Sequence, residues 1–343
     1  WLGAARDHAG RGDVVAAEVV TLGECLVALV ASAQGPLAEV AAFDRHIAGA
    51  EANVAVGLAR LGHSVEYIGR VGDDGFGTAI LRKLRGEGVG VERLRVDPEA
   101  PTGLMIRERR TLGAAQVLYY RTGSAGSRIA PEDVDPVAFG GARWLHLTGI
   151  TPALSASAKA AVDRAIALAR GARLTISVDL NLRRRLWTED AAAPVFRDLV
   201  ARADIVMGDA DEVAVAVDER GEGGAGGDAA EPEVLARKLV ALGAGTAVVK
   251  LGADGAVAAT GKGPVVHSPA LPVAAVLDPV GAGDAFAAGF IAAMLDGLPL
   301  DQALAAANAC GAAAVSAIGD MAGLPDRAEL DRLLAATGAD TLR

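Results

Sequence analysis

Cysteine is scarce in this sequence. Only Cys25 and Cys310 occur among its 343 residues. Two cysteines cannot build the disulfide framework of small secreted domains, and such a composition suits the reducing cytosol. The sequence therefore indicates a cytoplasmic enzyme, with both cysteines in its core rather than acting as reactive thiols.

Basic residues are also in deficit. The 33 lysines and arginines stand against 43 aspartates and glutamates, which gives a net charge of -10. Nucleic acids and anionic membranes are bound by clustered positive charge, so the charge balance argues against both as partners. A local basic pocket for a small anionic metabolite remains compatible with this balance.

Long apolar runs and metal-ligand patterns are missing as well. A membrane span needs about 18 or more consecutive apolar residues, and the closest run, 276–295, is interrupted by Asp278, Pro279 and Asp284. The five histidines show no spacing such as His-x-x-x-His. No structural zinc site is therefore expected.

Two segments show no pattern of packed structure. Residues 1–17 lack the basic start and apolar middle of a signal peptide, and we expect them to be a disordered leader. Residues 219–233, ERGEGGAGGDAAEPE, are rich in glycine, but no Lys-Ser or Lys-Thr pair follows and no strand leads into them. A flexible surface insertion is therefore favoured over a phosphate-binding loop.

The sequence does contain a regular alternation of strands and helices. Strands are predicted at 18–30, 65–72, 143–149, 173–181, 204–212 and 246–252, and helices at 51–62, 76–88, 155–170, 189–202, 231–242, 284–296, 301–317 and 326–336. This alternation is typical of the α/β class, with a doubly wound, mostly parallel sheet flanked by helices. Apolar residues make up 52% of the chain, enough for a sizeable core in one domain over 18–340.

A second, smaller sheet is predicted from another pattern. Residues 102–110 and 115–123 look like two strands joined by a short Thr-Leu-Gly turn. Together with residues 36–48 they predict a small β-sheet lid, formed from about 36–48 and 100–123.

The segment Gly281-Ala282-Gly283-Asp284 precedes a long apolar helix. The first N–H groups of a helix are unpaired and partly positive, and small residues let a phosphate approach them. Asp284 would repel that phosphate unless a third group lies between them. A substrate hydroxyl fits, because the acid can take its proton while the anion hole stabilises the transferring phosphoryl group. The alternative is a capping aspartate with glycines that serve tight packing.

Longer motifs resemble those of a known family. DPVGAGDAFAAGF (278–290) resembles the C-terminal motif of the ribokinase-like (PfkB) sugar kinases, and AGAEANVAVGLARLG (48–62) with GRVGDDGFG (69–77) resembles their N-terminal motif. The resemblance covers roughly residues 18 to 340. Four further segments are similar to the 2-keto-3-deoxygluconate kinase branch: GAEAN (49–53), YYRTGSAGS (119–127), WLHLTGITPALS (144–155) and DLNLRRRLW (179–187).

The resemblance implies roles on the sugar side of the site. It implies that Asp284 is the general base for the terminal hydroxyl of a sugar acid, beside the anion hole of Gly281, Ala282 and Gly283. Arg121 and Arg183 are candidates for the substrate carboxylate, since a guanidinium fork matches that geometry. For Asn53 the alternative is a helix cap, and for a Tyr-x-Arg pair it is surface decoration. The implied substrate-binding residues are Gly49, Asn53, Tyr119, Arg121, Arg183, Asp284 and Asp320.

The resemblance also implies roles for residues on the nucleotide side of the site. Glu212 matches the family acid that organises Mg²⁺ through water, with an exposed helix charge as the alternative, and Asp179 is either functional or structural. The family's usual Asp-Thr is Asp278-Pro279 here, which removes a hydroxyl and an N–H and counts against a K⁺ site at that loop. The implied nucleotide-binding residues are Asn181, Arg183, Lys250, Gly252, Gly255, Gly281, Gly283 and Asn308.

The function expected from the resemblance is transfer of phosphate from ATP, with Mg²⁺, to the 6-hydroxyl of 2-keto-3-deoxygluconate. A homodimer or larger homo-oligomer that pairs through the lid is expected. The alternatives are a kinase for fructose, ribose or 5-keto-2-deoxygluconate, or a non-catalytic sugar or nucleotide sensor on the same fold. A dinucleotide oxidoreductase would need Gly-x-Gly-x-x-Gly after the first strand, which TLGECLVAL (21–29) lacks.

Overall fold

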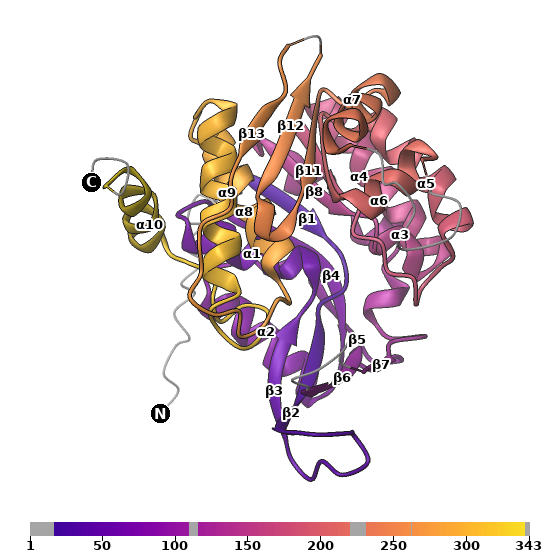
Figure 1. Ribbon diagram of the computed structural model, residues 1–343. Helices are drawn as coiled ribbons and strands as arrows, with labels where there is room; N and C mark the ends of the chain where they lie inside the picture. Colours follow the sequence, from indigo (N-terminus) through magenta and orange to yellow (C-terminus); the bar gives the residue numbers. More distant parts are fainter. Residues whose placement is uncertain (1–16, 110–115, 220–230, 262, 340–343) are drawn as a thin grey trace, which may run out of the picture.

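The computed structural model describes residues 17–109, 116–219, 231–261 and 263–339. Its centre is a nine-stranded sheet in the order β13-β12-β11-β10-β9-β8-β1-β4-β5 (Figure 1). All neighbours from β11 to β5 are parallel, and β12 and β13 add an antiparallel edge. The predicted fold class is therefore confirmed. The strands are β1 (Val19–Leu22), β4 (Val65–Gly72), β5 (Leu94–Asp97), β8 (Trp144–Thr148), β9 (Thr175–Asp179), β10 (Ile205–Asp209), β11 (Thr246–Lys250), β12 (Ala256–Thr260) and β13 (Val266–Ser268).

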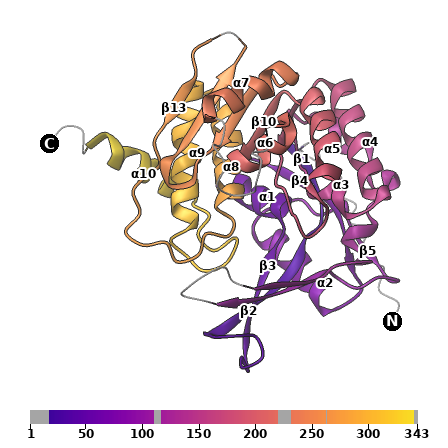
Figure 2. The ribbon, with the colours of Figure 1, turned by 45° about the vertical axis from the view of Figure 1, so that its right-hand side comes forward.

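Helices cover both faces of this sheet, as Figures 1 and 2 show. One apolar core lies under α1, α2, α8, α9 and α10, and the other under α4, α5, α6 and α7. Successive residues of one strand point into opposite cores, as Val248 and Val249 do. The helices are α1 (Ala50–Arg60), α2 (Gly75–Gly86), α3 (Thr151–Leu154), α4 (Ala156–Ala172), α5 (Glu189–Arg202), α6 (Ala210–Val217), α7 (Pro232–Leu242), α8 (Ala282–Leu295), α9 (Leu300–Ala314) and α10 (Arg327–Ala339).

A separate four-stranded sheet, here called the small sheet, projects from the large one (Figure 1). Its order is β3-β2-β6-β7, with strands β2 (Leu26–Gln34), β3 (Phe43–Ala48), β6 (Leu104–Arg109) and β7 (Val117–Tyr120). β2 and β6 are parallel, and the outer pairs are antiparallel. β3 and β7 therefore form its two edges.

The structure corrects the prediction of one strand over 18–30. That segment is two strands, β1 in the large sheet and β2 in the small one, because the chain turns at Gly23, Glu24 and Cys25. A side chain at Gly23 would collide with the carboxyl group of Glu51. Tertiary packing thus divides into two strands a segment whose Val- and Leu-rich sequence predicts one.

Other boundaries also differ from the prediction. Residues 36–42 form no strand, and the predicted strand 204–212 ends at Asp209, where α6 begins. β5, β12 and β13 were not expected. The predicted Thr-Leu-Gly turn, the leader up to residue 16 and residues 220–230 of the glycine-rich segment lie outside the described residues.

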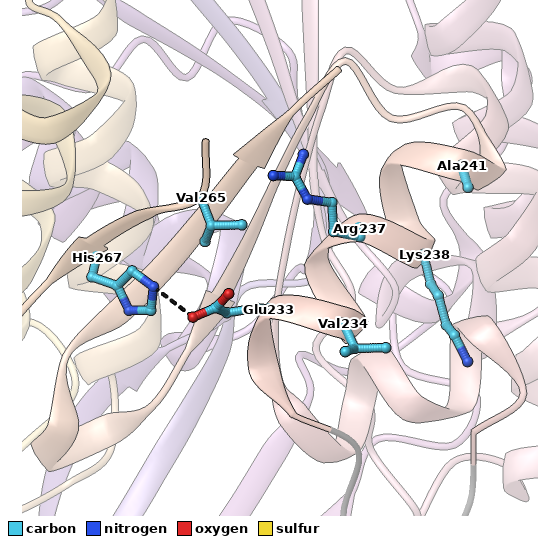
Figure 3. A pocket seen from close by; sticks show the side chains of 7 residues that line it. All are labelled: Glu233, Val234, Arg237, Lys238, Ala241, Val265 and His267. Atoms are coloured by element: carbon cyan, nitrogen blue, oxygen red, sulfur yellow. Dashed lines mark ion pairs between the residues drawn. The ribbon is translucent and has the colours of Figure 1, made fainter. Parts of the chain in front are cut away.

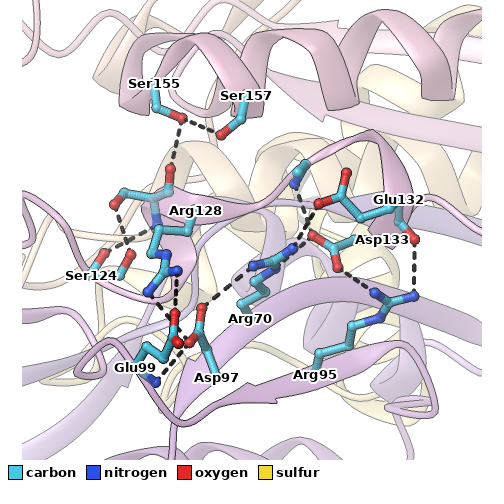
Figure 4. A network of polar contacts seen from close by, with 12 residues as sticks. Arg70, Arg95, Asp97, Glu99, Ser124, Arg128, Glu132, Asp133, Ser155 and Ser157 are labelled. Atoms are coloured by element: carbon cyan, nitrogen blue, oxygen red, sulfur yellow. Dashed lines mark hydrogen bonds and ion pairs between the residues drawn. The ribbon is translucent and has the colours of Figure 1, made fainter.

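A network of ion pairs connects the segment between β7 and β8 to strands β4 and β5 at the edge of the large sheet (Figure 4). Arg70 on β4 binds Asp133 at 2.7 Å, and Arg95 on β5 binds the other oxygen of that carboxylate at 3.0 Å. Arg128 binds Asp97 at 3.5 Å. The segment that leaves the small sheet is therefore held at several points.

Helices α1 and α8 pack closely against each other. A Cβ atom at Gly57 on α1 would lie 2.7 Å from the Cβ of Ala288 on α8. The absence of a side chain lets these two helices approach closely. Cys25 and Cys310 are each 1% exposed, which confirms the prediction that both belong to the core. Among the helices of the described ranges, none is long and apolar enough to cross a membrane.

Candidate active site

Asp284 lies in the first turn of α8 and is 7% exposed. The amide of Asn53 donates to its Oδ2 at 2.7 Å, and the amide of Asn181 lies 3.5 Å from its Oδ1. Burial raises the pKa of Asp284 to about 7, against the lowering effect of Asn53 and the nearby charge of Arg183. A carboxyl group with a pKa near neutrality is suited to act as a general base.

The partners of Asp284 are side chains from α1 and from the loop after β9, rather than the N–H groups of its own helix. The capping interpretation of Asp284 is therefore not supported. Gly281 is the N-cap of α8 with φ 82°, and a Cβ there would lie 2.6 Å from the carbonyl oxygen of Asp320. Without a capping side chain at Gly281, the first-turn N–H groups of α8 can receive an anion.

Lys250, at the end of β11, adds positive charge at this point. A Cβ at Gly283 would lie 3.4 Å from its Nζ, so the ammonium group lies beside the anion hole. The ammonium is held by both oxygens of Asp179 at 2.9 and 2.7 Å. Burial alone would lower the pKa of Lys250, but Asp179 and Glu212 leave it raised, so the amine stays protonated.

Glu212 is buried on α6 beside this pair. Its Oε1 accepts from the N–H of Leu182 at 2.8 Å, and its Oε2 accepts from the N–H of Asp209 at 3.0 Å. Burial raises the pKa of Glu212 to about 7, partly offset by the charge of Lys250. At 7% exposure it is not a solvated helix charge, so that alternative is wrong.

An apolar cavity of about 370 Å³ opens next to the anion hole. The amide of Asn308 in its wall donates to the carbonyls of Ser268 and Pro269 at 3.1 Å each. Five of the eight predicted nucleotide-side residues line this cavity, with apolar side chains such as Leu271, Val276 and Phe286: Lys250, Gly252, Gly255, Gly283 and Asn308. Asn181, Arg183 and Gly281 are not part of its lining. An apolar pocket that ends at a cationic anion hole matches the shape of a nucleoside polyphosphate.

Three predicted or neighbouring site residues carry a buried acceptor atom without a partner. Asn53 Oδ1, Asn181 Oδ1 and Asp320 Oδ1 have no hydrogen-bond partner among the described residues. Asn181 also has φ 43°, a left-handed conformation that asparagine adopts more readily than most residues with a side chain. Unpaired buried acceptors are rare and call for a donor, such as a ligand hydroxyl.

Arg121 is buried just beyond β7, with its guanidinium 5.6 Å from the ring centroid of Tyr119. Its Nε donates to Glu24 Oε2 at 2.7 Å, and Ser124 donates to the other oxygen of Glu24. Arg121 is therefore neither surface decoration nor a free cation. Among described contacts its Nη1 forms no hydrogen bond, which leaves one N–H₂ group for a ligand.

Of the remaining predicted residues, Gly49 is the N-cap of α1, and its Cα faces the carbonyl of Glu24. Asp320 is 6% exposed, and burial raises its pKa, against the lowering effect of Arg107. Arg183 is exposed, but its charge lowers the pKa of Asp284, so it lies near that carboxyl group. The structure thus brings Asn53 and Asn181 to Asp284, and Lys250 to Gly283, where parallel strands of the large sheet end, whereas Tyr119 lies on the small sheet.

Sequence reasoning missed two residues of this region. Glu24, whose side chain is fully buried, interrupts the apolar stretch TLGECLVAL, and an acid in such a run is a signal of a buried ion pair. Arg107 on β6 binds both oxygens of Asp278, at 2.9 and 2.5 Å. Nothing local marks Arg107, because it begins the charged run Arg107-Glu108-Arg109-Arg110, a pattern typical of a solvent-exposed segment.

A larger groove, of about 530 Å³, lies elsewhere, between α7 and β13 (Figure 3). It is lined by Glu233, Val234, Arg237, Lys238, Ala241, Val265 and His267. Its charged groups are engaged locally, since His267 binds Glu233 at 2.9 Å and Arg237 donates to the carbonyl of Gly261 at 3.2 Å. This groove contains none of the predicted site residues.

The comparisons with known proteins agree with this geometry. Residues 16–327 match the family described as pfkB family carbohydrate kinase. The chain is 42% identical over 301 residues to a 2-dehydro-3-deoxygluconokinase of Thermoproteus tenax, covering 87% of this chain and 88% of that one. It is 39% identical over 300 residues to the enzyme of the same name from Bacillus subtilis (strain 168), covering 87% and 89%.

Solved structures give the same result. The crystal structure of a PfkB protein from Polaromonas sp. JS666 has a TM-score of 0.81 at 38% identity, covering 92% of this chain and 99% of that one. A putative ribokinase II from E. coli, in complex with ATP and Mg²⁺, has a TM-score of 0.83 at 27% identity, covering 93% and 99%. The chain therefore belongs to the PfkB family of carbohydrate kinases.

Proposed function

We propose that the protein transfers the γ-phosphoryl group of ATP to the terminal 6-hydroxyl of 2-keto-3-deoxygluconate, which is 2-dehydro-3-deoxygluconate. The observation that carries the proposal is the set of unpaired buried acceptors Asn53 Oδ1, Asn181 Oδ1 and Asp320 Oδ1, because the amides of both asparagines also reach Asp284. These atoms suit a ligand rich in hydroxyl groups. The names of the relatives at 42% and 39% identity support this choice of sugar acid.

The reaction follows from the positions of these groups. Asp284 takes the proton of the 6-hydroxyl while that oxygen bonds to the γ-phosphorus and the bond to the ADP oxygen breaks. The N–H groups of the first turn of α8, with Lys250 beside them, stabilise the charge on the transferring group. General base catalysis contributes roughly 10²–10⁴-fold, and positioning and charge stabilisation supply most of the remainder.

The substrate carboxylate is assigned to Arg121 and Arg183. Arg121 offers Nη1, and its pairing with Glu24 fixes the direction of that group. A charge-assisted hydrogen bond of about 1.5–3 kcal/mol favours an acid over a neutral sugar by roughly 10- to 100-fold. Tyr119 stacks on the same guanidinium and limits its movement.

The site is expected to use Mg²⁺ but not to require a monovalent cation. Both oxygens of Glu212 accept backbone N–H groups, so this carboxylate suits an Mg²⁺ held through water rather than a direct bond. The ion would neutralise charge on the nucleotide phosphates. Near Pro279, the guanidinium of Arg107 already supplies positive charge to Asp278. Turnover is therefore expected without added K⁺.

A homodimer formed through the small sheet and a cytoplasmic location complete the proposal. Tyr119 and Tyr120 are 37% and 60% exposed on β7, an edge strand of that sheet. An exposed aromatic edge of this kind is usually covered by a partner. A second copy of the chain is the occupant that requires no other protein.

The first test is ATP turnover with Mg²⁺ against 2-keto-3-deoxygluconate, its galacto epimer, fructose, ribose and no sugar. Turnover should be highest with the keto acids and should fall about 10²–10⁴-fold in Asp284→Asn, with ATP binding unchanged. Turnover with fructose or ribose alone would refute the assignment to Arg121 and Arg183. ATP binding without turnover on any sugar would favour the sensor function.

A further inference from the structure

Arg107 joins the small sheet to the loop that precedes the anion hole. It lies on β6, is 8% exposed, and its guanidinium spans both oxygens of Asp278. Asp278 is itself 5% exposed and lies outside the small sheet, 171 residues further along the chain. A bidentate pair between two buried groups fixes both partners in distance and in angle.

Asp278 in turn holds backbone on both sides of Gly281. Its Oδ1 accepts the N–H of Val280 at 3.2 Å, and its Oδ2 accepts the N–H of Gly319 at 3.1 Å. Val280 immediately precedes Gly281, and the backbone of Asp320, which follows Gly319, packs against Gly281. Asp278 therefore determines where the N-terminus of α8 and its unpaired N–H groups lie.

A second strand of the small sheet reaches the same loop. A Cβ atom at Gly319 would lie 2.5 Å from Nδ1 of His46 on β3, so this strand also contacts the loop.

Asp278 is a charged carboxylate. Burial would raise its pKa, but the pKa is lowered by Arg107 and by the hydrogen bonds that Asp278 accepts from backbone N–H groups. The carboxylate is thus charged, and Arg107 supplies its compensating cation.

We propose that Arg107 is a positioning residue that makes the anion hole depend on the small sheet. When the small sheet lies against the loop that contains Asp278, Arg107 binds Asp278. Asp278 then holds the backbone around Gly281 in the arrangement that receives phosphate. Since the sugar-side residues Tyr119 and Arg121 belong to or follow the same sheet, sugar binding steadies Arg107 and thereby strengthens nucleotide binding. The inference uses the kinase activity and does not depend on which sugar is the substrate.

The test compares Arg107→Met with Arg109→Met, a matched control on the same strand whose guanidinium donates to the carbonyl of Ser32. With the sugar that the wild type uses best, Arg107→Met should raise KM for ATP at least about 10-fold and lower kcat about 10- to 100-fold, as expected for a displaced anion hole. The affinity for the sugar without nucleotide should change less than about 3-fold. Arg109→Met should resemble the wild type.

Coupling and rescue distinguish positioning from a merely structural role. In the wild type, sugar should tighten binding of a non-hydrolysable ATP analogue by about 5-fold or more, and Arg107→Met should abolish this effect. Added guanidinium should restore part of the kcat of Arg107→Ala, whereas equal ionic strength of sodium chloride should not. If Arg107→Met does not fold, Arg107→Lys, which keeps the charge without the fork, should fold and show a partial loss of coupling.

Three results would overturn the proposal: an unchanged KM for ATP in folded Arg107→Met, coupling that survives in that variant, or failure of guanidinium to rescue Arg107→Ala. A wild type that uses a neutral sugar would refute the proposed substrate and leave these readouts intact. The two failures are therefore distinguishable.

Discussion

At the residue scale, the burial of Asp284 determines the pH at which this carboxyl group can act as the general base. Its pKa rises to about 7 because the carboxyl group is withdrawn from water, and Asn53 limits that rise by donating to the charged form. The base is the ionised form, so its population grows as pH increases through this pKa.

The pH profile of kcat/KM for the sugar should follow this ionisation. We expect the rate constant to rise about tenfold per pH unit below about pH 6, to reach half its maximum near pH 7 and to level off above about pH 8. Asn53→Ala should move the midpoint upward, because it removes a hydrogen bond to the ionised form. Neither the protonation of ATP nor that of Glu212, whose pKa is also raised to about 7, would respond to Asn53. An identical midpoint in both enzymes would therefore show that the profile does not report Asp284.

The buried ion pair of Glu24 and Arg121 is expected to affect both substrate preference and stability. Glu24→Gln should reduce the preference for the keto acid over a neutral sugar about 10-fold or more, mainly through KM, because Nη1 of Arg121 loses its fixed direction. It should also lower the free energy of unfolding by about 2–3 kcal/mol, since a buried cation loses its counter-ion.

Glu99→Gln provides the matched control for that change. Glu99 binds Arg128 at 3.1 Å, but its side chain is 77% exposed. An exposed pair contributes little, so urea denaturation should detect a change of less than about 1 kcal/mol. Equal losses in both variants would contradict the role assigned to burial.

At the scale of elements, the crossing of α1 and α8 determines the distance between Asn53 and Asp284. Gly57 faces Ala288 one helical turn beyond Asn53, so a side chain there must push the two helices apart. Gly57→Ala should lower the free energy of unfolding by about 1–3 kcal/mol, as overpacking does. It should also lower kcat several-fold, because the hydrogen bond to Asp284 lengthens.

Gly86→Ala is the control at this scale. Gly86 ends α2, and an added Cβ would meet nothing within 4 Å. Alanine is preferred over glycine in a helix, so stability should be unchanged or higher by up to about 1 kcal/mol. Denaturation and kcat measured side by side would show whether the cost at Gly57 arises from the helix crossing.

At the scale of the whole molecule, the small sheet is the part that the proposed dimer would cover. Tyr120→Arg, on its exposed edge, should convert the dimer into a monomer by light scattering, because a charged side chain opposes burial of an edge strand. ATP binding should survive, since Tyr120 does not line the nucleotide cavity. A wild-type protein that is monomeric at micromolar concentration would disprove this assembly.

Part of the structure could be predicted from local sequence. The large sheet follows from alternating apolar strands and amphipathic helices, and the anion hole follows from Gly281 and Gly283 before an apolar helix. The break at Gly23 could not be predicted in this way, because it depends on Glu51 packing against a glycine from another element. The antiparallel strands β12 and β13 are short, and β13 has only three residues, so their local signal is weak.

The α/β fold, the family and the identity of the candidate base follow from the linear sequence, because periodicity and motifs are properties of neighbouring residues. The pairing of charges, in contrast, depends on the folded arrangement: Arg121 with Glu24, Arg107 with Asp278, and Lys250 with Asp179. These partners are 71 to 171 residues apart in the chain. Ion pairs and buried unpaired acceptors arise from distance and burial, which exist only once the chain has folded.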